Sequence, residues 1–444
     1  MTRLPPAVPG GAVVNAWRFA RDPVGFLTWA TETVGETFTL QLPGDHPRLV
    51  TGDPDLVEQI WKLPADVIRS DAQALPIDLG RTSILLADGA AHRRHRKLQA
   101  PPLHGERLVQ YAETIASETH RLLDGWTPGE TRALLPDFRD LTLRVMARCL
   151  LGSDGGREQA LLDVAHRWME RASSPWIFVA SIGLGTPRVR EWLRGLAEGA
   201  QADRSRWTWW GRLGDDRAAL GRLLASEVAE CRADSSRTDV LAMLVSAVDA
   251  DGEGLSDAEL VDAALTLVVG GHETTANTLC WTLLHLLEHP EVVAKVRAGA
   301  GDAYLDACAR ESMRLSPIAP AVNRQLAKPV ELGGWQVPEG VILWPCVTTL
   351  HRNPRVWTEP DRFDPDRWLD GDGRKAAWIP FGGGGRRCIG AAFATLELRV
   401  VLQVLLDRVE LARPEGAVST PVVRGVALSP SDGLVVEVRS VRAR

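Results

Sequence analysis

Residues 381–390, with the sequence FGGGGRRCIG, constrain the fold of this chain more than any other stretch. The four glycines at 382–385 allow the backbone to turn tightly and to approach a flat ligand, because a residue without Cβ adopts positive φ at little cost. The pattern over 389–409 then predicts an apolar-periodic helix. Cys388 therefore lies at the start of a helix, where unpaired amide donors and the helix dipole favour a thiolate. A thiolate in such a glycine cradle is a soft metal ligand.

Length and composition predict one globular unit. No Ser/Gly-rich or acidic linker and no repeat divides the 444 residues, so we expect a single domain over residues 1–444. The net charge of −6 argues against a general nucleic-acid binder, which normally carries a basic excess. Residues 1–11 contain Pro and Gly clusters instead of an apolar core, so we expect neither a signal peptide nor a membrane anchor, and a cytoplasmic protein.

The six cysteines are widely spaced and include no CxxC pair. Several lie inside apolar helical patterns, so we expect reduced, buried thiols and not disulfides. Only Cys388 has a chemically special setting among Cys149, Cys231, Cys280, Cys308, Cys346 and Cys388.

The hydrophobic periodicity predicts a mainly α fold with small β-sheets. We expect a β-containing N-terminal part over about residues 1–90, a helical core over about 91–317, and a β/loop region over about 318–444. Finer expectations are helices over 12–32 and 54–62, a β-hairpin over 36–51, and one long apolar helix over 256–287. Short strands are expected at 330–332, 341–343, 418–423 and 434–438. Ser256 and Glu259 have the spacing of a capping box for the long helix.

The middle of that helix contains two adjacent glycines, which are unfavourable in a helix interior. It contains GGHETT over residues 270–275, and each glycine in a helix interior costs about 1 kcal/mol against alanine. The glycines either open the helix for a small ligand, with Glu273 and Thr274 as a proton path, or allow a kink and close helix packing. A zinc-protease motif is excluded, because Ala276 stands where HExxH requires its second histidine.

Two charged groups carry little information alone. Glu311 and Arg314 are neighbours on one helix face, and surface pairs of this kind are common and weak. Residues 92–97 contain four permanent cations and two histidines, of which His92 and Arg96 share a helix face. This cluster is a solvated face, a nucleic-acid patch, or a clamp for the carboxylates of a cofactor.

Four motifs, taken in order, resemble those of the cytochrome P450 family. They are GGHETT at 270–275, the ExxR pair, the PDRW segment at 365–368 and the cysteine loop. The resemblance covers at least residues 88–435. It implies a single-domain P450 fold, with haem between a long distal helix and the proximal cysteine-loop helix, and a haem-thiolate monooxygenase that uses O2 as cosubstrate.

The resemblance also implies roles for individual residues. Cys388 is the ligand of the iron in haem b, and its anionic sulfur favours O–O cleavage. Phe381 and Gly382 belong to the loop that surrounds the ligand, and amides of this loop tune the sulfur. The two haem propionates are bound by His92, Arg96, Arg324 and Arg386.

On the distal side the resemblance gives Thr274 and Glu273 the roles of hydrogen-bonding dioxygen and relaying protons. His272, beside the acid, either packs away from the site, which we favour, or titrates near neutral pH and affects proton delivery. Glu311 and Arg314, completed by Arg367, form a structural network that holds the cysteine loop.

The substrate and the electron donor are less constrained. The implied pocket walls are mainly aliphatic and neutral, so we expect a hydrophobic small molecule, oxidised in bacterial secondary or lipid/terpenoid metabolism. The walls fall at residues 71–86, around 168–214, before Gly270, and at 318–322 and 429–433. For the Trp-rich run at 207–210 we favour ordinary packing over stacking on a planar substrate.

We expect no fused redox module, so electrons should come from NAD(P)H through a ferredoxin reductase and a ferredoxin. Four other cations form either a positive surface that docks an acidic electron carrier or a merely solvated face. They are Arg93, Arg94, Lys97 and Arg387. Two alternatives remain. The first is a peroxide-driven, coupling or rearrangement enzyme on the same scaffold, and the second is a non-catalytic haem-binding protein.

Overall fold

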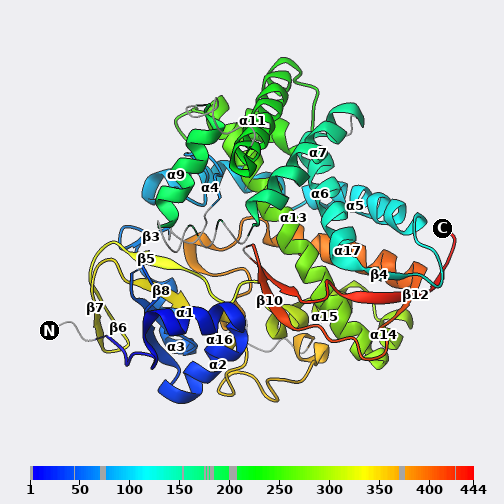
Figure 1. The fold of residues 1–444 in the computed structure, drawn as a ribbon. Helices are drawn as coiled ribbons and strands as arrows, with labels where there is room; N and C mark the ends of the chain where they lie inside the picture. The colour runs from blue at the N-terminus through cyan, green and yellow to red at the C-terminus, as the bar shows by residue number, and fades with distance from the viewer. Residues whose placement is uncertain are drawn as a thin grey trace. The chain divides into compact units, whose positions relative to one another are not determined.

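The computed structural model describes residues 4–44, 46–70, 77–152, 155–174, 177, 180, 185–199, 208–369, 376–425 and 427–444. The chain divides into two compact units. Figure 1 labels their helices and strands. Unit 1 comprises Met1–Arg69, Ile115–Leu141 and Glu273–Arg444, and unit 2 comprises Ser70–Thr114 and Thr142–His272. The single domain expected over residues 1–444 stays a prediction.

Unit 1 holds all the strands of the described chain and the cysteine loop. Its helices are α1 (Gly11–Arg21), α2 (Pro23–Val34), α3 (Pro54–Trp61), α14 (Pro290–Arg297), α15 (Asp302–Leu315), α16 (Val347–Leu350), η2 (Pro365–Trp368), η4 (Gly384–Arg386) and α17 (Ala391–Arg408). Its strands are β1 (Thr37–Leu40), β2 (Arg48–Thr51), β3 (Ile68–Arg69), β4 (Thr131–Ala133), β5 (Arg324–Leu326), β6 (Val330–Leu332), β7 (Trp335–Val337), β8 (Ile342–Pro345), β9 (Val409–Ala412), β10 (Pro421–Arg424), β11 (Ala427–Pro430) and β12 (Val435–Val441).

The described part of unit 2 is helical. Its own helices are α4 (Gly89–Gln99), η1 (Pro101–Leu103), α7 (Gly155–Ala172), α9 (Thr186–Ala197), α11 (Trp209–Ala233) and α12 (Val240–Ser246). Three further helices contribute residues to both units, namely α5 (Arg107–Asp124), α6 (Leu134–Leu151) and α13 (Asp257–Glu288).

The largest sheet of unit 1 has the strand order β1-β2-β8-β5-β3. The expected hairpin over residues 36–51 is confirmed, because β1 pairs with β2 antiparallel and Thr37 lies opposite Thr51. β2 pairs with β8 in parallel, with Arg48 opposite Ile342, so this pairing joins the N-terminal segment to the region that precedes the cysteine loop. The smaller sheets are β10-β11, β4-β12-β9 and β6-β7.

Helix boundaries follow capping chemistry. Ser256 and Glu259 form the expected capping box of α13, since the Ser256 N–H donates to Glu259 Oε2 over 2.8 Å and the Glu259 N–H donates to Ser256 Oγ over 3.3 Å. The single helix expected over residues 12–32 is wrong, because α1 ends before Asp22 and α2 begins at Pro23. Proline is favoured at a first helical position and the Asp22 side chain caps the Gly25 N–H, so a new helix begins there.

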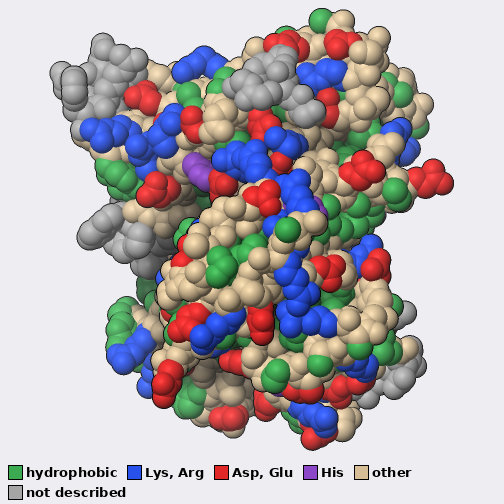
Figure 2. Space-filling model, turned by 90° about the vertical axis from the view of Figure 1, so that its right-hand side faces the viewer, with side chains coloured by type: hydrophobic (Ala, Val, Ile, Leu, Met, Phe, Trp, Pro, Cys, Tyr) green, Lys and Arg blue, Asp and Glu red, His purple; other side chains and the backbone are tan. Residues whose placement is uncertain are grey.

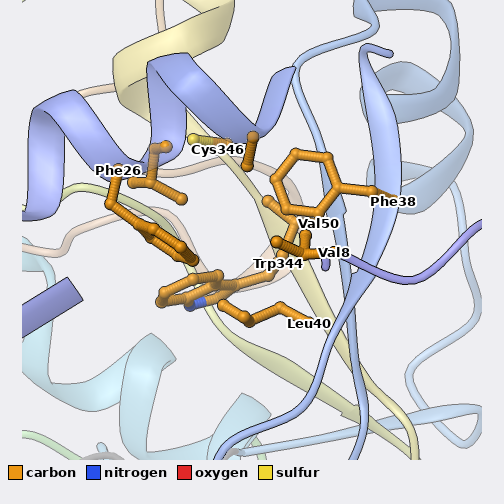
Figure 3. Close-up of a cluster of buried hydrophobic side chains, with 9 residues drawn as sticks. Val8, Phe26, Phe38, Leu40, Val50, Trp344 and Cys346 are labelled. Atoms are coloured by element: carbon orange, nitrogen blue, oxygen red, sulfur yellow. The ribbon is translucent and has the colours of Figure 1, made fainter. Parts of the chain in front are cut away.

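A cluster of buried apolar side chains fixes α2 on this sheet (Figure 3). Phe26 of α2 lies close to Trp344 of β8, while Phe38 and Leu40 approach from β1. Phe38 is 1% exposed and Leu40 is fully buried, and a fully buried side chain of this size contributes about 1.5–3 kcal/mol. This core therefore holds the N-terminal helices on the sheet that includes β8.

The cysteines and the surface charges agree with the composition. No disulfide joins the six cysteines, as expected, and Cys388 alone among them is exposed. On the face shown in Figure 2, Lys and Arg side chains lie interspersed with Asp and Glu side chains. No helix within the described residues is long and apolar enough to cross a bilayer.

Candidate functional site

Backbone hydrogen bonds close the cysteine loop on itself. The Cys388 N–H donates to the carbonyl of Phe381 over 2.8 Å, and the Gly382 N–H donates to that of Ile379 over 2.9 Å. Helix α17 begins at Ala391, so Cys388 precedes the first helical residue instead of lying inside the helix. The loop therefore presents one exposed thiol from a backbone that its own hydrogen bonds hold in place.

Three of the loop glycines are explained by an aromatic neighbour and by backbone conformation. A Cβ on Gly383 would lie 2.5 Å from the indole of Trp61, the last residue of α3. Gly382 and Gly384 have φ of 67° and 61°, values that side-chain-bearing residues rarely adopt. Trp61 therefore accounts for the glycine at 383, whereas a Cβ on Gly385 would meet nothing within 4 Å, and the approach of this loop to a flat ligand stays a prediction.

Two arginines of unit 1 make a cationic pair beside this loop. Arg324 is 7% exposed and donates to the carbonyls of Asn323 and Gly383, over 2.7 and 3.5 Å. Burial, and then the cation of Arg386, lower the pKa of Arg324 to about 10. Within the described residues Arg324 has no carboxylate partner, so an anion here would relieve the electrostatic cost. The propionates of haem are anions of this kind, and the pair fits them.

The metal chemistry available to the protein alone is limited. Within the described part of the chain, no group of three or more His, Cys, Asp or Glu side chains could hold a metal ion. A metal bound by Cys388 alone would therefore need its other ligands from a cofactor. The macrocycle of haem supplies such ligands, so the isolated thiolate also fits this group.

The basic cluster at residues 92–97 lies on α4 of unit 2. His92 is buried and Arg96 is half-buried, which agrees with their expected position on one helix face. Arg93 and Lys97 are exposed. The structure therefore assigns the members of the cluster to different surroundings.

Arg94 departs from the expected surface role. Its side chain pairs with Asp249 over 2.8 Å and with Glu259 over 3.2 Å. His95 contacts Glu259 as well, over 3.0 Å. Arg94 thus belongs to an ion cluster that ties α4 to the first turn of α13, and it does not stand on a free basic face.

The two glycines of the GGHETT segment have different surroundings. A Cβ on Gly271 would overlap Cε of Met146, so Gly271 allows close packing on α6. A Cβ on Gly270 would meet nothing within 4 Å, which leaves open space beside the helix. His272 is 4% exposed and its ring centroid lies 6.2 Å from that of His166 on α7, so its ring is packed within unit 2, while its effect on proton delivery stays untested.

The acid of the segment has partners that the sequence motif does not contain. Arg139 of α6 forms an ion pair with Glu273, and the Asn277 side-chain amide donates to Glu273 Oε1 over 3.1 Å. The Thr274 carbonyl accepts a hydrogen bond from Thr278 Oγ1 over 2.9 Å. Arg139 was not predicted, because it lies 134 residues before Glu273 and only the fold brings the two together.

The ExxR pair is the centre of a buried network and not a surface pair. Glu311 and Arg314 are both fully buried, and their side chains meet over 2.8 and 2.9 Å. Arg367 donates to Glu311 over 3.0 Å, as expected from the PDRW segment. Two further donors were not predicted, the Trp368 indole and the Asp364 N–H, each 3.0 Å from the carboxylate. All of these groups lie in unit 1.

His351 connects this network to the start of the cysteine loop. Its Nδ1 lies 3.2 Å from the carbonyl of Arg314, and its Nε2 accepts from the Ile379 N–H over 2.9 Å. Burial lowers the pKa of His351 to about 3, with a smaller contribution from the cation of Arg314, so its ring stays neutral. A neutral ring with a protonated Nδ1 suits both partners. The ExxR helix is thereby linked to a residue next to the loop.

A line of aromatic rings runs along the same route. The ring centroids of Trp357 and Trp368 are 5.6 Å apart, those of Trp368 and Trp378 5.5 Å, and those of Trp378 and Phe381 5.9 Å. Contacts at these distances contribute about 0.5–1.5 kcal/mol each beyond area burial. Phe381 is thus positioned by packing that begins at the buried network.

Glu397 of α17 is a second buried acid that sequence reasoning missed. It is 1% exposed, and burial raises its pKa well above the usual range of a glutamic acid. Thr275 is close enough to lower that pKa by a smaller amount, although neither carboxyl oxygen has a partner of standard hydrogen-bond geometry. The burial therefore keeps Glu397 protonated on the helix that follows the cysteine loop.

The described parts of the expected pocket walls include charged residues. Asp78 and Arg194 are 5% and 7% exposed and are paired with each other, which departs from the expectation of neutral walls. Trp210 packs against Trp192 and Trp209, with centroids 4.8 and 4.6 Å apart, in line with ordinary packing. Trp207, and residues 71–76 of the first wall, lie outside the described residues.

Removal of the Glu311 carboxylate is expected to destabilise unit 1 strongly. Glu311→Ala leaves two buried guanidiniums and one indole without their acceptor, so the free energy of unfolding should fall by about 3–5 kcal/mol. Denaturant unfolding of the variant measures this loss. The exposed Glu339→Ala is the control and should change stability by less than about 0.5 kcal/mol. Equal stability of the two variants would contradict the network.

Glu397→Gln is expected to change the pH dependence of stability. The folded protein keeps this acid protonated, whereas the unfolded chain releases the proton above about pH 4.5. The free energy of unfolding should therefore fall as pH rises from that value, by up to about 1.4 kcal/mol per pH unit. Glutamine does not titrate, so the variant should gain stability over the wild type at pH 8 relative to pH 5. Parallel stability curves from denaturant unfolding across this range would argue against a protonated Glu397.

Known proteins resemble this chain in sequence and in fold. The family model described as "Cytochrome P450" matches residues 5–185 and 217–437. Two proteins of Mycobacterium tuberculosis are similar over nearly their whole length. "Putative cytochrome P450 135B1" is 35% identical over 457 residues, covering 99% of this chain and 92% of its own, and "Putative cytochrome P450 138" is 32% identical over 440 residues, covering 98% and 96%.

Solved structures show the same fold at lower identity. "Retinoic acid bound cyanobacterial CYP120A1" superimposes with a TM-score of 0.81 at 22% identity, covering 99% of this chain and 100% of that one. "Crystal structure of cytochrome P450DA heme domain" gives a TM-score of 0.80 at 21% identity, with coverages of 100% and 98%. The expected mainly α fold with small sheets is confirmed. The chain belongs to the cytochrome P450 family of haem-thiolate monooxygenases and is an oxidoreductase of that family.

Proposed function

We propose that Cys388 is the thiolate ligand of the haem iron in this monooxygenase. The observation that carries this assignment is the exposed thiol in a closed glycine loop of unit 1. The cation Arg324 donates to the carbonyl of Gly383 in this loop. Arg324 and Arg386 would bind the propionates, together with His92 and Arg96 of α4. Haem held in this way supplies an iron that activates dioxygen with electrons from a redox partner.

Glu273 and Thr274 would handle the protons of the reaction. Reduction of dioxygen to water and one transferable oxygen atom consumes two protons, and these need donors of fixed position. Arg139 and Asn277 hold the Glu273 carboxylate, so it stays next to Thr274 on α13. The open space beside Gly270 leaves room for a small ligand one turn before Thr274.

The substrate would be a hydrophobic small molecule of bacterial secondary or lipid/terpenoid metabolism. Apolar side chains in the described pocket walls support a hydrophobic substrate, and the mycobacterial relatives support a bacterial setting. Electrons would come from NAD(P)H through a ferredoxin reductase and a ferredoxin, with exposed Arg93, Lys97 and Arg387 as candidate contacts for an acidic carrier. Arg94 is left out of this surface, because it is engaged with Asp249 and Glu259.

A peroxide-driven enzyme, or one that couples or rearranges its substrate, is the alternative on the same scaffold. The presence of Glu273 and Thr274 favours the dioxygen-dependent reaction, because peroxide carries its own protons and needs no relay. A non-catalytic haem protein would have no use for this pair.

Thr274→Ala is expected to uncouple electron consumption from oxygen transfer. Without the hydroxyl, a proton donor of fixed position would be lost from α13, so more of the NAD(P)H oxidised in the reconstituted ferredoxin system should appear as hydrogen peroxide, with an increase of about tenfold or more. Peroxide released per NAD(P)H consumed measures the effect, and Thr282→Ala, two turns further along α13, is the control. Wild-type coupling in Thr274→Ala would contradict the assigned role.

A further inference from the structure

Helix α1 packs against unit 1 through one of its faces. Asn15 is 1% exposed and donates to the carbonyl of Val8 over 3.4 Å. The ring centroid of Phe19 lies 5.6 Å from that of Trp344 on β8 and 6.3 Å from that of Phe26 on α2. These contacts fix which side of α1 faces the core of unit 1, and thereby which side faces the solvent.

The solvent-facing side of α1 is apolar. Val13, Val14 and Trp17 are 73%, 43% and 60% exposed. The two valines lie four and three residues before Trp17, so the three side chains share one face of the helix. A surface helix normally carries polar residues on its outward face. A group of exposed apolar side chains, here called the α1 face, is instead typical of a surface that binds a partner.

Two arginines border the α1 face. Arg21 lies one turn after Trp17, and its guanidinium is 5.5 Å from the centroid of the Trp17 ring. Arg18 is half-buried on the same helix. Within the described residues, neither arginine forms an ion pair with a carboxylate. The positive charge beside the α1 face is therefore not neutralised by a described acid.

The surrounding sequence keeps this region positive. Residues 1–21 contain three arginines and no acid, although the chain as a whole has a net charge of −6. The first acid of the chain, Asp22, accepts a hydrogen bond from the Gly25 N–H over 2.9 Å as the cap of α2. The one acid inside α2, Glu32, lies in the last turn of that helix. A local excess of cations on an acidic chain favours an anionic partner.

A bilayer that contains anionic phospholipid matches both properties of this surface. Tryptophan is enriched at membrane–water interfaces, and anionic headgroups attract arginines close to the membrane. With 11 residues, α1 is about 16 Å long, whereas about 20 apolar residues are needed to cross a bilayer, so α1 would lie in the plane of the interface. A second protein chain is a poorer match, because a stable protein interface takes about 20–30 residues from each side.

We propose that the α1 face binds the surface of a bilayer that contains anionic phospholipid. Val13, Val14 and Trp17 would enter the interface, and Arg21 would contact the phosphate groups. Such a surface contact differs from the spanning anchor that the N-terminal sequence argues against. It goes beyond the proposed function and gives it a setting, because a hydrophobic substrate concentrates in lipid.

Flotation with vesicles tests this contact on the haem-loaded, full-length protein. One set of vesicles contains equal parts of phosphatidylcholine and phosphatidylglycerol, and the other contains phosphatidylcholine alone. The partition coefficient for the anionic vesicles should be about tenfold or more above that for the neutral vesicles, and it should fall as salt is added. Arg21→Gln should weaken binding to the anionic vesicles and leave binding to the neutral vesicles unchanged.

Val13→Glu and Trp17→Glu test the apolar part of the contact. Each places a negative charge in the α1 face, so each should lower the partition coefficient for the anionic vesicles by about tenfold or more. The matched control is Val109→Glu on α5, because Val109 is 73% exposed, as Val13 is. This variant has the same change of net charge and should bind like the wild type.

Three results would overturn the proposal: no flotation of the wild type with either set of vesicles, equal partition to both sets, or an equal loss in Val13→Glu and Val109→Glu. Sedimentation velocity tests the other occupant. A wild-type dimer that becomes a monomer in Val13→Glu would show that the α1 face joins two copies of the chain, and it would also contradict the proposal. Flotation does not depend on turnover, and the absorption spectrum of the same samples reports separately on Cys388.

Discussion

The buried carboxylate of Glu311 is the interaction on which the arrangement of the cysteine loop depends. A charge with no contact to water must be neutralised by partners of fixed position, and here two guanidiniums, one indole and one backbone N–H converge on it. Those partners come from α15 and from the segment at residues 364–368. Their convergence fixes Arg314, whose carbonyl orients His351, and His351 receives the N–H of Ile379 just before the loop. The hydrogen bonds and ion pairs of Glu311, which lie away from the thiol, thus help to hold the loop in its conformation.

Buried positive charge beside the cysteine loop marks a place that suits an acidic ligand. Arg324 and Arg386 are close enough that burial and their mutual repulsion lower a guanidinium pKa, which fits haem propionates. Arg194 and Arg217 of unit 2 instead share the buried carboxylate of Asp78, so these cations already have a partner within the protein.

The parts of this protein that local chemistry determines could be predicted from the sequence. The capping box of Ser256 and Glu259, the hairpin over residues 36–51 and the turn before Cys388 need only neighbouring residues. The helix break at Pro23 was missed because the apolar periodicity continues through it, although the proline itself was a visible signal.

Contacts between distant segments could not be predicted in this way. Arg139 lies 134 residues from Glu273, and Asp78 lies 116 residues from Arg194, so no local pattern joins them. Glu397 lies between Leu396 and Leu398, and an acid at such a position is a local signal of burial with an unusual protonation state. The contact between Gly383 and Trp61 could not be predicted either, because the sequence does not show which aromatic side chain packs against the loop.

The absorption spectrum of the reduced, carbon-monoxide-bound protein tests the central assignment of Cys388 most directly. Thiolate ligation predicts a strongly red-shifted Soret band for the wild type and for Cys346→Ala, which changes a buried thiol. Cys388→His should instead give the band of an ordinary haem-histidine protein. A haem-histidine band in the wild type, or a red-shifted band that survives in Cys388→His, would contradict the assignment of Cys388 as the iron ligand.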